Sequence, residues 1–317
     1  MLISVNPKNI LVVQIGKLGD MVLTGPLFYE LKRLYPEADI KVLASPVNAE
    51  FADSLKSVDE VIVYKKNVFR DLLLASNLKK NKFDLWIDVK DGYSRTAAAL
   101  LKFSKPKVSI GFNHDEKIFD IDLKDFVRGA HAIDLSLAPI YYLGSEPFYR
   151  KPVLTDFLNK GNHGAKYDIT VNVSAGNQSR YWPEKSWIEL IKKIQEKYNL
   201  KINIIGLKAD SELILNIKES INNNLITVNY DLQLSSLINA LNSSKIIISP
   251  DTSIIHLASG LNKPLLGLYP KVDWNYDRFK PLSDNFETVI SKSDKGISDI
   301  EVNEVFEKFE KLYNEVN

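Results

Sequence analysis

The stretch Ile248–Leu268, ISPDTSIIHLASGLNKPLLGL, predicts the end of a buried strand, a turn, a short helix and the start of another strand. The β-branched run Lys245–Ile248 is short enough for a buried parallel strand. Asp251 and Thr252 are helix-capping residue types, and Gly260 suits the helix end. Because the first turn of such a helix has free N–H groups and the positive end of the helix dipole, it suits a phosphate.

A histidine strengthens this interpretation without deciding it. His256 lies four residues after Thr252, so both side chains share one helical face. His256 could then donate a hydrogen bond to a phosphate or sugar oxygen beside the free N–H groups. The alternative is a capped helix with one buried, hydrogen-bonded histidine, and this stretch alone leaves both open.

The N-terminal segment has the same organisation. Ile10–Ile15 is an apolar strand, Gly16–Asp20 is a glycine-bearing loop, a helix follows from about Met21, and Ile40–Leu43 is the next strand. In an open parallel sheet, ligands bind beyond the carboxyl ends of the strands. Asp20 is predicted to lie at such a position.

The loop around Asp20 points to proton transfer rather than to dinucleotide binding. Its glycines are spaced G-x-x-G instead of G-x-G-x-x-G, which disfavours a nicotinamide dehydrogenase. An acidic side chain here would repel a diphosphate, whereas it suits abstraction of a proton. The alternative for Asp20 is an N-cap on the following helix, and the two roles can coexist.

The remaining sequence continues to alternate between strands and helices in two halves. Strands are predicted at 60–64, 83–88, 108–112, 168–173, 201–205 and 225–228, and helices at 68–78, 96–103, 130–142, 184–198, 210–221, 234–241 and 302–313. Residues 114–128 are predicted to be an irregular, mobile surface segment. We therefore expect an α/β protein with a domain at 1–150, a linker at 151–167 and a domain at 168–317, both Rossmann-like and facing a cleft.

Composition narrows the functional class. Apolar residues make up 45% of the 317 positions, and 41 Lys and Arg balance 40 Asp and Glu, which gives no reason to expect a nucleic-acid partner. There is no cysteine, so disulfides and thiolate catalysis are excluded. No signal peptide is evident and no apolar run approaches about 20 residues. We expect a cytoplasmic protein that reaches any membrane-linked acceptor from the cytoplasmic surface.

Four motifs in register resemble the family 9 glycosyltransferases, the ADP-heptose:lipopolysaccharide heptosyltransferases. They extend over almost the whole chain. The motifs are Ile10–Asp20 with Leu23–Pro26 and Tyr35-Pro36, His131–Asp134, Val173–Gly176 with Arg180–Pro183, and Asp251–Ala258 with Lys263-Pro264.

The resemblance implies a fold and a reaction. The fold is the two-domain GT-B type, in which the last helix often packs back on the first domain. The reaction is an inverting, metal-independent transfer of heptose from ADP-heptose, with Asp20 as the general base. Arg180 occupies the place of a lysine that contacts phosphate, and Thr252 and Ser253 match residues that meet the diphosphate.

The resemblance also implies the remaining donor contacts. Asp251 could accept from sugar hydroxyls, His256 could contact phosphate or sugar, and Ser174 belongs to the facing loop. Gly206 and Asp210 match a nucleoside-binding pair in which the carboxylate accepts from ribose hydroxyls. The alternative for Asp210 is a helix N-cap.

On the acceptor side, Lys17 and Arg95 are candidates to bind an anionic glycolipid or glycan at the cytoplasmic face of the inner membrane. The sequence suggests no cofactor and no metal motif. Departures from the family pattern at Gln14, Gly16-Lys17 and Ser253 leave a different donor or acceptor open. The alternatives are a transferase of another nucleotide sugar and a catalytically silent sugar-nucleotide-binding protein, which would not need the carboxylate of Asp20.

Overall fold

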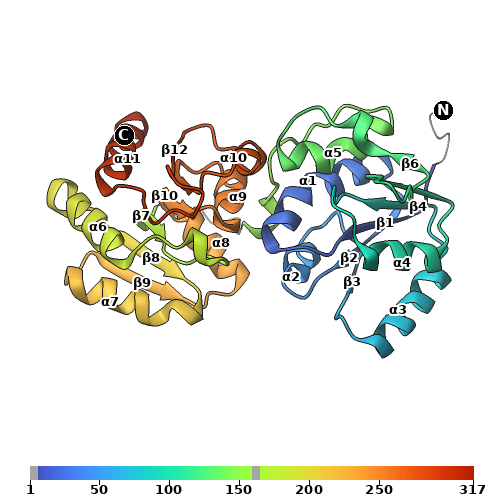
Figure 1. Ribbon diagram of the computed structural model, residues 1–317, viewed down its shortest axis with the longest axis horizontal. Coiled ribbons are helices and arrows are strands. Elements are labelled where there is room, and N and C mark those ends of the chain that lie inside the picture. Colours follow the sequence, from blue (N-terminus) through green and yellow to red (C-terminus); the bar gives the residue numbers. More distant parts are fainter. Residues whose placement is uncertain (1–5, 159–164) are drawn as a thin grey trace. The chain divides into compact units, whose positions relative to one another are not determined.

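The computed structural model describes residues 6–158 and 165–317, apart from the side chains of residues 68–72 and 273. The chain divides into two compact units, Met1–Asp156 and Phe157–Asn317 (Figure 1). The division falls inside the segment 151–167 that the sequence predicts as a linker, although residues 159–164 lie outside the described part.

The first unit is built on a six-stranded parallel sheet with the order β3-β2-β1-β4-β5-β6. Its strands are β1 (Asn9–Gln14), β2 (Asp39–Ala44), β3 (Glu60–Val63), β4 (Leu85–Asp88), β5 (Val108–Gly111) and β6 (Ile121–Asp122). The order reverses between β1 and β4, which is the point where doubly wound sheets bind ligands. The loops that leave β1 and β4 therefore flank the expected site of this unit.

Helices cover both faces of this sheet. They are α1 (Leu18–Leu34), α2 (Ala49–Asp53), α3 (Val68–Asn81), α4 (Arg95–Ser104) and α5 (Ala132–Tyr142), with short 3-10 turns at Leu123–Phe126 and Thr155–Phe157. Helices α3 and α4 pack over a core that includes Leu11, Val13 and Trp86. Helices α1 and α5 pack together on the opposite face (Figure 1).

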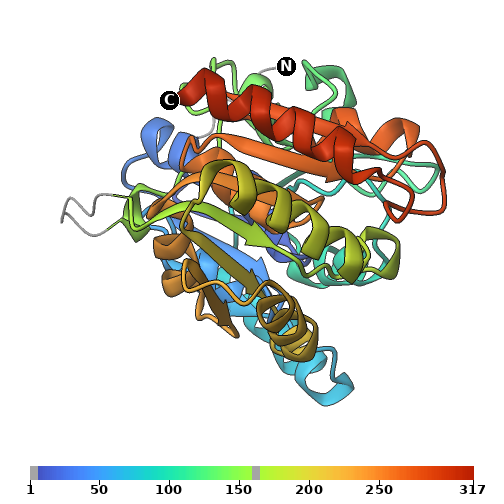
Figure 2. The ribbon, with the colours of Figure 1, turned by 90° about the vertical axis from the view of Figure 1, so that its left-hand side faces the viewer.

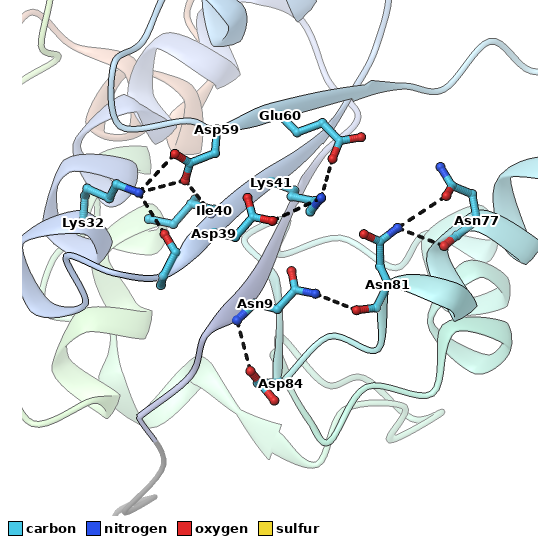
Figure 3. Close-up of polar contacts among 11 residues, drawn as sticks. Asn9, Lys32, Asp39, Ile40, Lys41, Asp59, Glu60, Asn77, Asn81 and Asp84 are labelled. Carbon is cyan, nitrogen blue, oxygen red and sulfur yellow. Dashed lines mark hydrogen bonds and ion pairs between the residues drawn. The ribbon is translucent and has the colours of Figure 1, made fainter.

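The amino ends of these strands are tied by polar contacts (Figure 3). Lys32 forms an ion pair with Asp59 at 2.8 Å. The Asn9 side chain donates to the Asn81 carbonyl at 2.6 Å, and the Asn9 N–H donates to Asp84 at 3.0 Å. This network joins the amino ends of the strands, opposite the carboxyl ends where the expected site lies.

The second unit repeats the strand order of the first. Its parallel sheet has the order β12-β11-β10-β7-β8-β9. The strands are β7 (Tyr167–Asn172), β8 (Ile202–Gly206), β9 (Ile226–Tyr230), β10 (Ser244–Pro250), β11 (Leu265–Tyr269) and β12 (Phe286–Ile290). The order reverses between β7 and β10, so the exits of these two strands flank the second switch point.

The helices of the second unit end with a long amphipathic one. They are α6 (Glu184–Tyr198), α7 (Ser211–Ile221), α8 (Leu234–Asn242), α9 (Ser253–Gly260), α10 (Asp273–Phe279) and α11 (Val302–Val316), with 3-10 turns at Gln178–Arg180 and Lys208–Asp210. Helix α11 buries Phe309 and contacts α6, β11 and β12 within this unit (Figure 2). Lys308 and Lys311 pair with Glu287 of β12, which fixes α11 on the sheet.

The structure corrects the predicted elements in several places. The segment predicted as irregular contains β6, and α2, α10 and β12 are additional elements. Helix α1 begins at Leu18 rather than near Met21, so Asp20 lies in its first turn instead of preceding it. Among residues 6–158 and 165–317, every helix is too short or too polar to cross a bilayer.

Candidate active site

Asp20 lies in the first turn of α1, directly after the loop that leaves β1. Its Oδ2 accepts the Lys17 N–H at 2.8 Å, so the carboxylate satisfies an N–H group that the helix itself leaves unpaired. Among the described residues, Oδ1 accepts no hydrogen bond. One carboxylate oxygen is thus held by the loop, and the other is available for a further hydrogen bond.

The backbone of Asp20 is held from a second direction. The Thr24 hydroxyl donates to the Asp20 carbonyl at 2.8 Å, and the Gln14 amide donates to the Thr24 hydroxyl at 2.8 Å. A Cβ at Gly16 would lie 2.6 Å from Asp20 Oδ2 and 2.8 Å from Gln14 Oε1. A side chain at this position would therefore displace the carboxylate of Asp20 or the amide of Gln14.

A second carboxyl group ends β4, across the switch point from the Asp20 loop. Asp88 pairs in register with Val13 of β1 and is only 4% exposed. Its Oδ1 accepts the Lys90 N–H at 3.0 Å. Burial raises the pKa of Asp88 to about 7, against the opposing influence of Lys90. The sequence places Asp88 at a strand end but gives no sign of this shift.

Lys17 and Arg95, the two acceptor-side candidates, are both exposed. Lys17 contributes its backbone N–H to Asp20 and precedes α1, while Arg95 is the first residue of α4. The structure therefore leaves both cationic groups accessible to a ligand. Contact between either side chain and an acceptor remains a prediction.

In the second unit, Thr252 is the N-cap of α9, as the sequence predicts. Its hydroxyl accepts the Ile254 N–H at 3.3 Å. The same hydroxyl lies 3.2 Å from the Ser249 hydroxyl and accepts from the Asn172 amide at 3.3 Å. These contacts hold the turn before α9 in place, and Ser253 opens the helix with its N–H at the positive end of the dipole.

Arg180 is joined to the same turn. Its Nη1 donates to the Asp251 carbonyl at 2.8 Å, and its Nη2 lies 3.2 Å from Asp251 Oδ2. The Asn275 amide donates to this carboxylate oxygen at 2.8 Å. Asp251 is 2% exposed, so its carboxylate orients Arg180 from inside the protein. The contact of Asp251 with sugar hydroxyls remains a prediction, and no sequence motif identifies Asn275.

Ser174 and Gly206, predicted separately, lie against each other. The Ser174 hydroxyl accepts the Leu207 N–H at 2.9 Å, which joins the exits of β7 and β8. A Cβ at Gly206 would lie 2.3 Å from Ser174 Oγ. Asn172 holds this loop by accepting the Ser174 N–H and donating to the Ser174 carbonyl. Asn172 was not predicted, although a polar residue that ends an apolar strand is a usable signal.

Asp210 occupies the N-cap position of α7, but its side chain does not cap that helix. It accepts the Tyr181 hydroxyl at 3.0 Å instead. Burial and then the hydrogen bond to Asp210 raise the pKa of Tyr181. The capping alternative is therefore wrong for the side chain of Asp210, while its nucleoside contact remains a prediction.

Two histidines of the sequence motifs are buried. His256 is 6% exposed and its ring lies 5.9 Å from the Phe279 ring, so its predicted ligand contact remains a prediction. His131 caps α5, because its Nδ1 accepts the Ile133 N–H at 3.1 Å. His131 therefore has a structural role as the N-cap of α5.

The two switch-point sites carry complementary chemistry. The first offers a carboxylate oxygen for a proton, and the second offers an oriented guanidinium beside a helix N-terminus, which suits a diphosphate. Residues 72–308 match the family model of glycosyltransferase family 9 (heptosyltransferase). The chain therefore belongs to glycosyltransferase family 9 and is a glycosyltransferase.

Particular relatives agree with this assignment. The chain is 22% identical over 341 residues to lipopolysaccharide heptosyltransferase 3 of Escherichia coli K12, covering 94% of this chain and 96% of that one. Its fold matches E. coli heptosyltransferase WaaC with ADP (TM-score 0.79, 17% identity, 96% and 99% coverage). It also matches WaaC with ADP-2-deoxy-2-fluoro heptose (TM-score 0.78, 18% identity, 96% and 99% coverage). The architecture is thus the GT-B type.

Proposed function

We propose that this protein moves a heptose from ADP-heptose, with inversion and without a metal ion, to a lipopolysaccharide inner-core or related surface-glycan acceptor. Asp20 is the general base that takes the proton of the acceptor hydroxyl. The hydroxyl oxygen forms a bond to the anomeric carbon, and the bond from that carbon to the diphosphate breaks, so ADP leaves. Attack opposite to the leaving group inverts the anomeric centre.

The observation that carries this proposal is the fixation of Asp20. One carboxylate oxygen is held by the Lys17 N–H and the backbone by Thr24, while Oδ1 has no hydrogen-bond partner among the described residues. A base that is already held in one orientation increases the rate of proton transfer, because the entropy cost of orienting it is met by folding rather than during the reaction. A silent sugar-nucleotide-binding protein would not need such an arrangement.

The donor side is supported by the second switch point. Arg180 is held by Asp251 next to Thr252 and Ser253, where the positive end of α9 lies. Such groups stabilise the negative charge that develops on a departing diphosphate. The bound ADP and ADP-2-deoxy-2-fluoro heptose of the WaaC structures support the choice of donor.

The acceptor side of the proposal is a glycolipid or glycan at the cytoplasmic face of the membrane, which the protein reaches from the cytoplasm. The exposed cations Lys17 and Arg95 follow β1 and β4 and would meet anionic groups of that acceptor. This role is supported by their exposure and by their place beside the loops of the first switch point.

Calorimetric titration with ADP, UDP, GDP and dTDP tests the donor directly. The measurement is made in EDTA, because the proposed charge stabilisation uses Arg180 and the N-terminus of α9. We expect tight binding of ADP alone, and weaker ADP binding by Arg180→Gln. Preference for another nucleotide would contradict the ADP-heptose donor, and binding of none of the four would contradict the transferase proposal.

A further inference from the structure

One buried side-chain amide binds several backbone carbonyls of the loop that precedes Asp20. The Asn48 side chain donates through Nδ2 to the Gln14 carbonyl at 2.9 Å and lies 3.3 Å from the Gly16 carbonyl and 3.5 Å from the Lys17 carbonyl. Three carbonyl groups in a four-residue segment thus share one donor. Since that segment ends at the N–H that holds Asp20, Asn48 lies one contact away from the proposed base.

The geometry shows that the Asn48 amide is committed to this loop. Asn48 precedes α2, where asparagine usually caps the helix with its own side chain, but here it makes no capping hydrogen bond. Its Oδ1 accepts the Ser45 N–H at 2.9 Å instead, which fixes the orientation of the amide plane. The residue is 0% exposed, so the loop carbonyls that it binds could not easily find water in its place.

Ser45 supports the same segment. Its hydroxyl donates to the Gly16 carbonyl at 2.7 Å. Ser45 and Asn48 both follow β2, the neighbour of β1, so β2 supplies the anchors for the loop that leaves β1. A change in these anchors would shift Lys17, and the carboxylate of Asp20 would move with the N–H that it accepts.

We propose that Asn48 is a positioning residue for the reaction, which holds the Gln14–Lys17 backbone so that Asp20 keeps its catalytic orientation. This inference rests on the proposed base role of Asp20. Asn48 is not a catalytic residue, because it acts through the loop and contacts Asp20 only by way of Lys17.

The primary test compares Asn48→Asp with the wild-type protein in a transfer assay with ADP-heptose and a lipopolysaccharide inner-core acceptor. This substitution keeps the oxygen that accepts from Ser45 but removes the donor to the three carbonyls. We expect kcat to fall by about 10- to 100-fold, the loss associated with a reacting group that is misplaced by about 1 Å. The KM for ADP-heptose and the calorimetric Kd for ADP should stay within about twofold.

The matched control is Asn9→Ala. Asn9 is the first residue of β1, and Asn48 contacts Gln14, the last residue of the same strand. Like Asn48, Asn9 donates its side-chain amide to a backbone carbonyl, that of Asn81 (Figure 3). We expect this variant to retain wild-type kcat even if its thermal midpoint falls. Equal losses of kcat in both variants, in proportion to lost stability, would overturn the inference.

Ser45→Ala provides a second, milder variant in case Asn48→Asp does not fold. It removes one donor to the Gly16 carbonyl and leaves the Asn48 amide in place. We expect a smaller loss of kcat in the same direction, with unchanged ADP affinity. A fully active Ser45→Ala protein alongside an unfolded Asn48→Asp protein would overturn the inference, since the loop would then tolerate loss of an anchor.

A double-variant cycle separates this inference from the proposed function. If Asn48 acts through Asp20, adding Asn48→Asp to Asp20→Asn should cause no further loss of turnover. Multiplicative losses would show that Asn48 acts independently of Asp20 and would overturn the inference. Undiminished turnover of Asp20→Asn by itself would instead overturn the base role, and the positioning role with it.

Discussion

Replacing Asp88 by asparagine should stabilise the protein at neutral and higher pH. The carboxyl group ends β4, is 4% exposed and accepts a single hydrogen bond among the described residues, from the Lys90 N–H. Burial raises the pKa of Asp88 from 3.8 to about 7. Asparagine has the same shape, keeps the oxygen that accepts from Lys90 and carries no charge at any pH.

The sign and size of the effect follow from proton linkage. Because the pKa of Asp88 is raised in the folded state, its proton stabilises the fold fully below pH 3.8, and this contribution is lost as the pH rises to about 7. Each pH unit in that interval changes the free energy of unfolding by about 1.4 kcal/mol. Over about three units, the wild-type protein loses about 4 kcal/mol that Asp88→Asn keeps. The two proteins should be equally stable near pH 3.5 and differ most above pH 7.5.

The assay is urea unfolding between pH 3.5 and 8.5, with hydrogen exchange of a peptide that contains β4 as the readout. This readout reports the stability of the first unit by itself. Asp84→Asn is the control of opposite sign. The hydrogen bond from Lys107, followed by N–H groups of Lys8 and Asn9, lowers the pKa of Asp84 despite the opposing effect of burial. Its stabilising contribution is present above pH 3.8 and lost as the pH falls, so Asp84→Asn should destabilise the protein at neutral pH.

The reasoning about Asp88 would be refuted by parallel stability profiles of the wild type and Asp88→Asn across this pH range. An NMR titration that places the Asp88 carboxyl pKa below 5 would refute it independently. Either result would mean that water or a nearby donor stabilises the ionised carboxylate in solution.

The remaining predictions concern glycines whose surroundings differ. Gly16→Ala should lower kcat by at least about 10-fold with unchanged ADP affinity in calorimetry, since the new Cβ would lie 2.6 Å from Asp20 Oδ2 and displace the base. Gly206→Ala should weaken ADP binding by about 10-fold without changing the pH dependence of kcat, because its Cβ would lie 2.3 Å from Ser174 Oγ. Gly25→Ala should lower the free energy of unfolding measured in urea and leave transfer intact: its Cβ would lie 3.8 Å from Phe51, but Pro26 follows it inside α1, and a Cβ before proline disfavours the helical conformation. Wild-type kcat in Gly16→Ala, or wild-type ADP affinity in Gly206→Ala, would contradict the respective contact.

The doubly wound organisation could be predicted because parallel strands buried on both faces are continuous apolar runs. Ile10–Val13 and Ile246–Ile248 are such runs, and each is followed by turn residues and a helical pattern. Both lie beside a switch point in the structure. The rule that ligands bind beyond the carboxyl ends then selects Asp20 and Thr252 without any knowledge of tertiary contacts.

The segment after Tyr269 could not be predicted in the same way. Helix α10 begins after Val272 without a side-chain cap, and β12 is an edge strand in which exposed and buried residues alternate. Glu287 is buried within this strand because Lys308 and Lys311 reach it from α11. Such long-range pairing leaves no local pattern in the sequence.

The hydrogen-bond and ion-pair partners of the site residues could not be predicted from the sequence either. Sequence position identifies Asp251 and Arg180 separately, but their ion pair and the amide of Asn275 depend on how three distant segments fold together. Asn48 similarly binds a loop more than 30 residues earlier in the chain. Strand periodicity predicts which residues reach the carboxyl edge of a sheet, whereas their hydrogen bonds are set by tertiary structure.

The most direct test of the account is single-turnover transfer from ADP-heptose to a lipopolysaccharide inner-core acceptor by the wild type and by Asp20→Asn. Asparagine can still accept the Lys17 N–H, so the loop should keep its shape while the base is lost. We predict a rate at least about 100-fold lower, in the range that general base catalysis contributes, with unchanged calorimetric affinity for ADP. Transfer by Asp20→Asn at a rate close to that of the wild type would contradict the account.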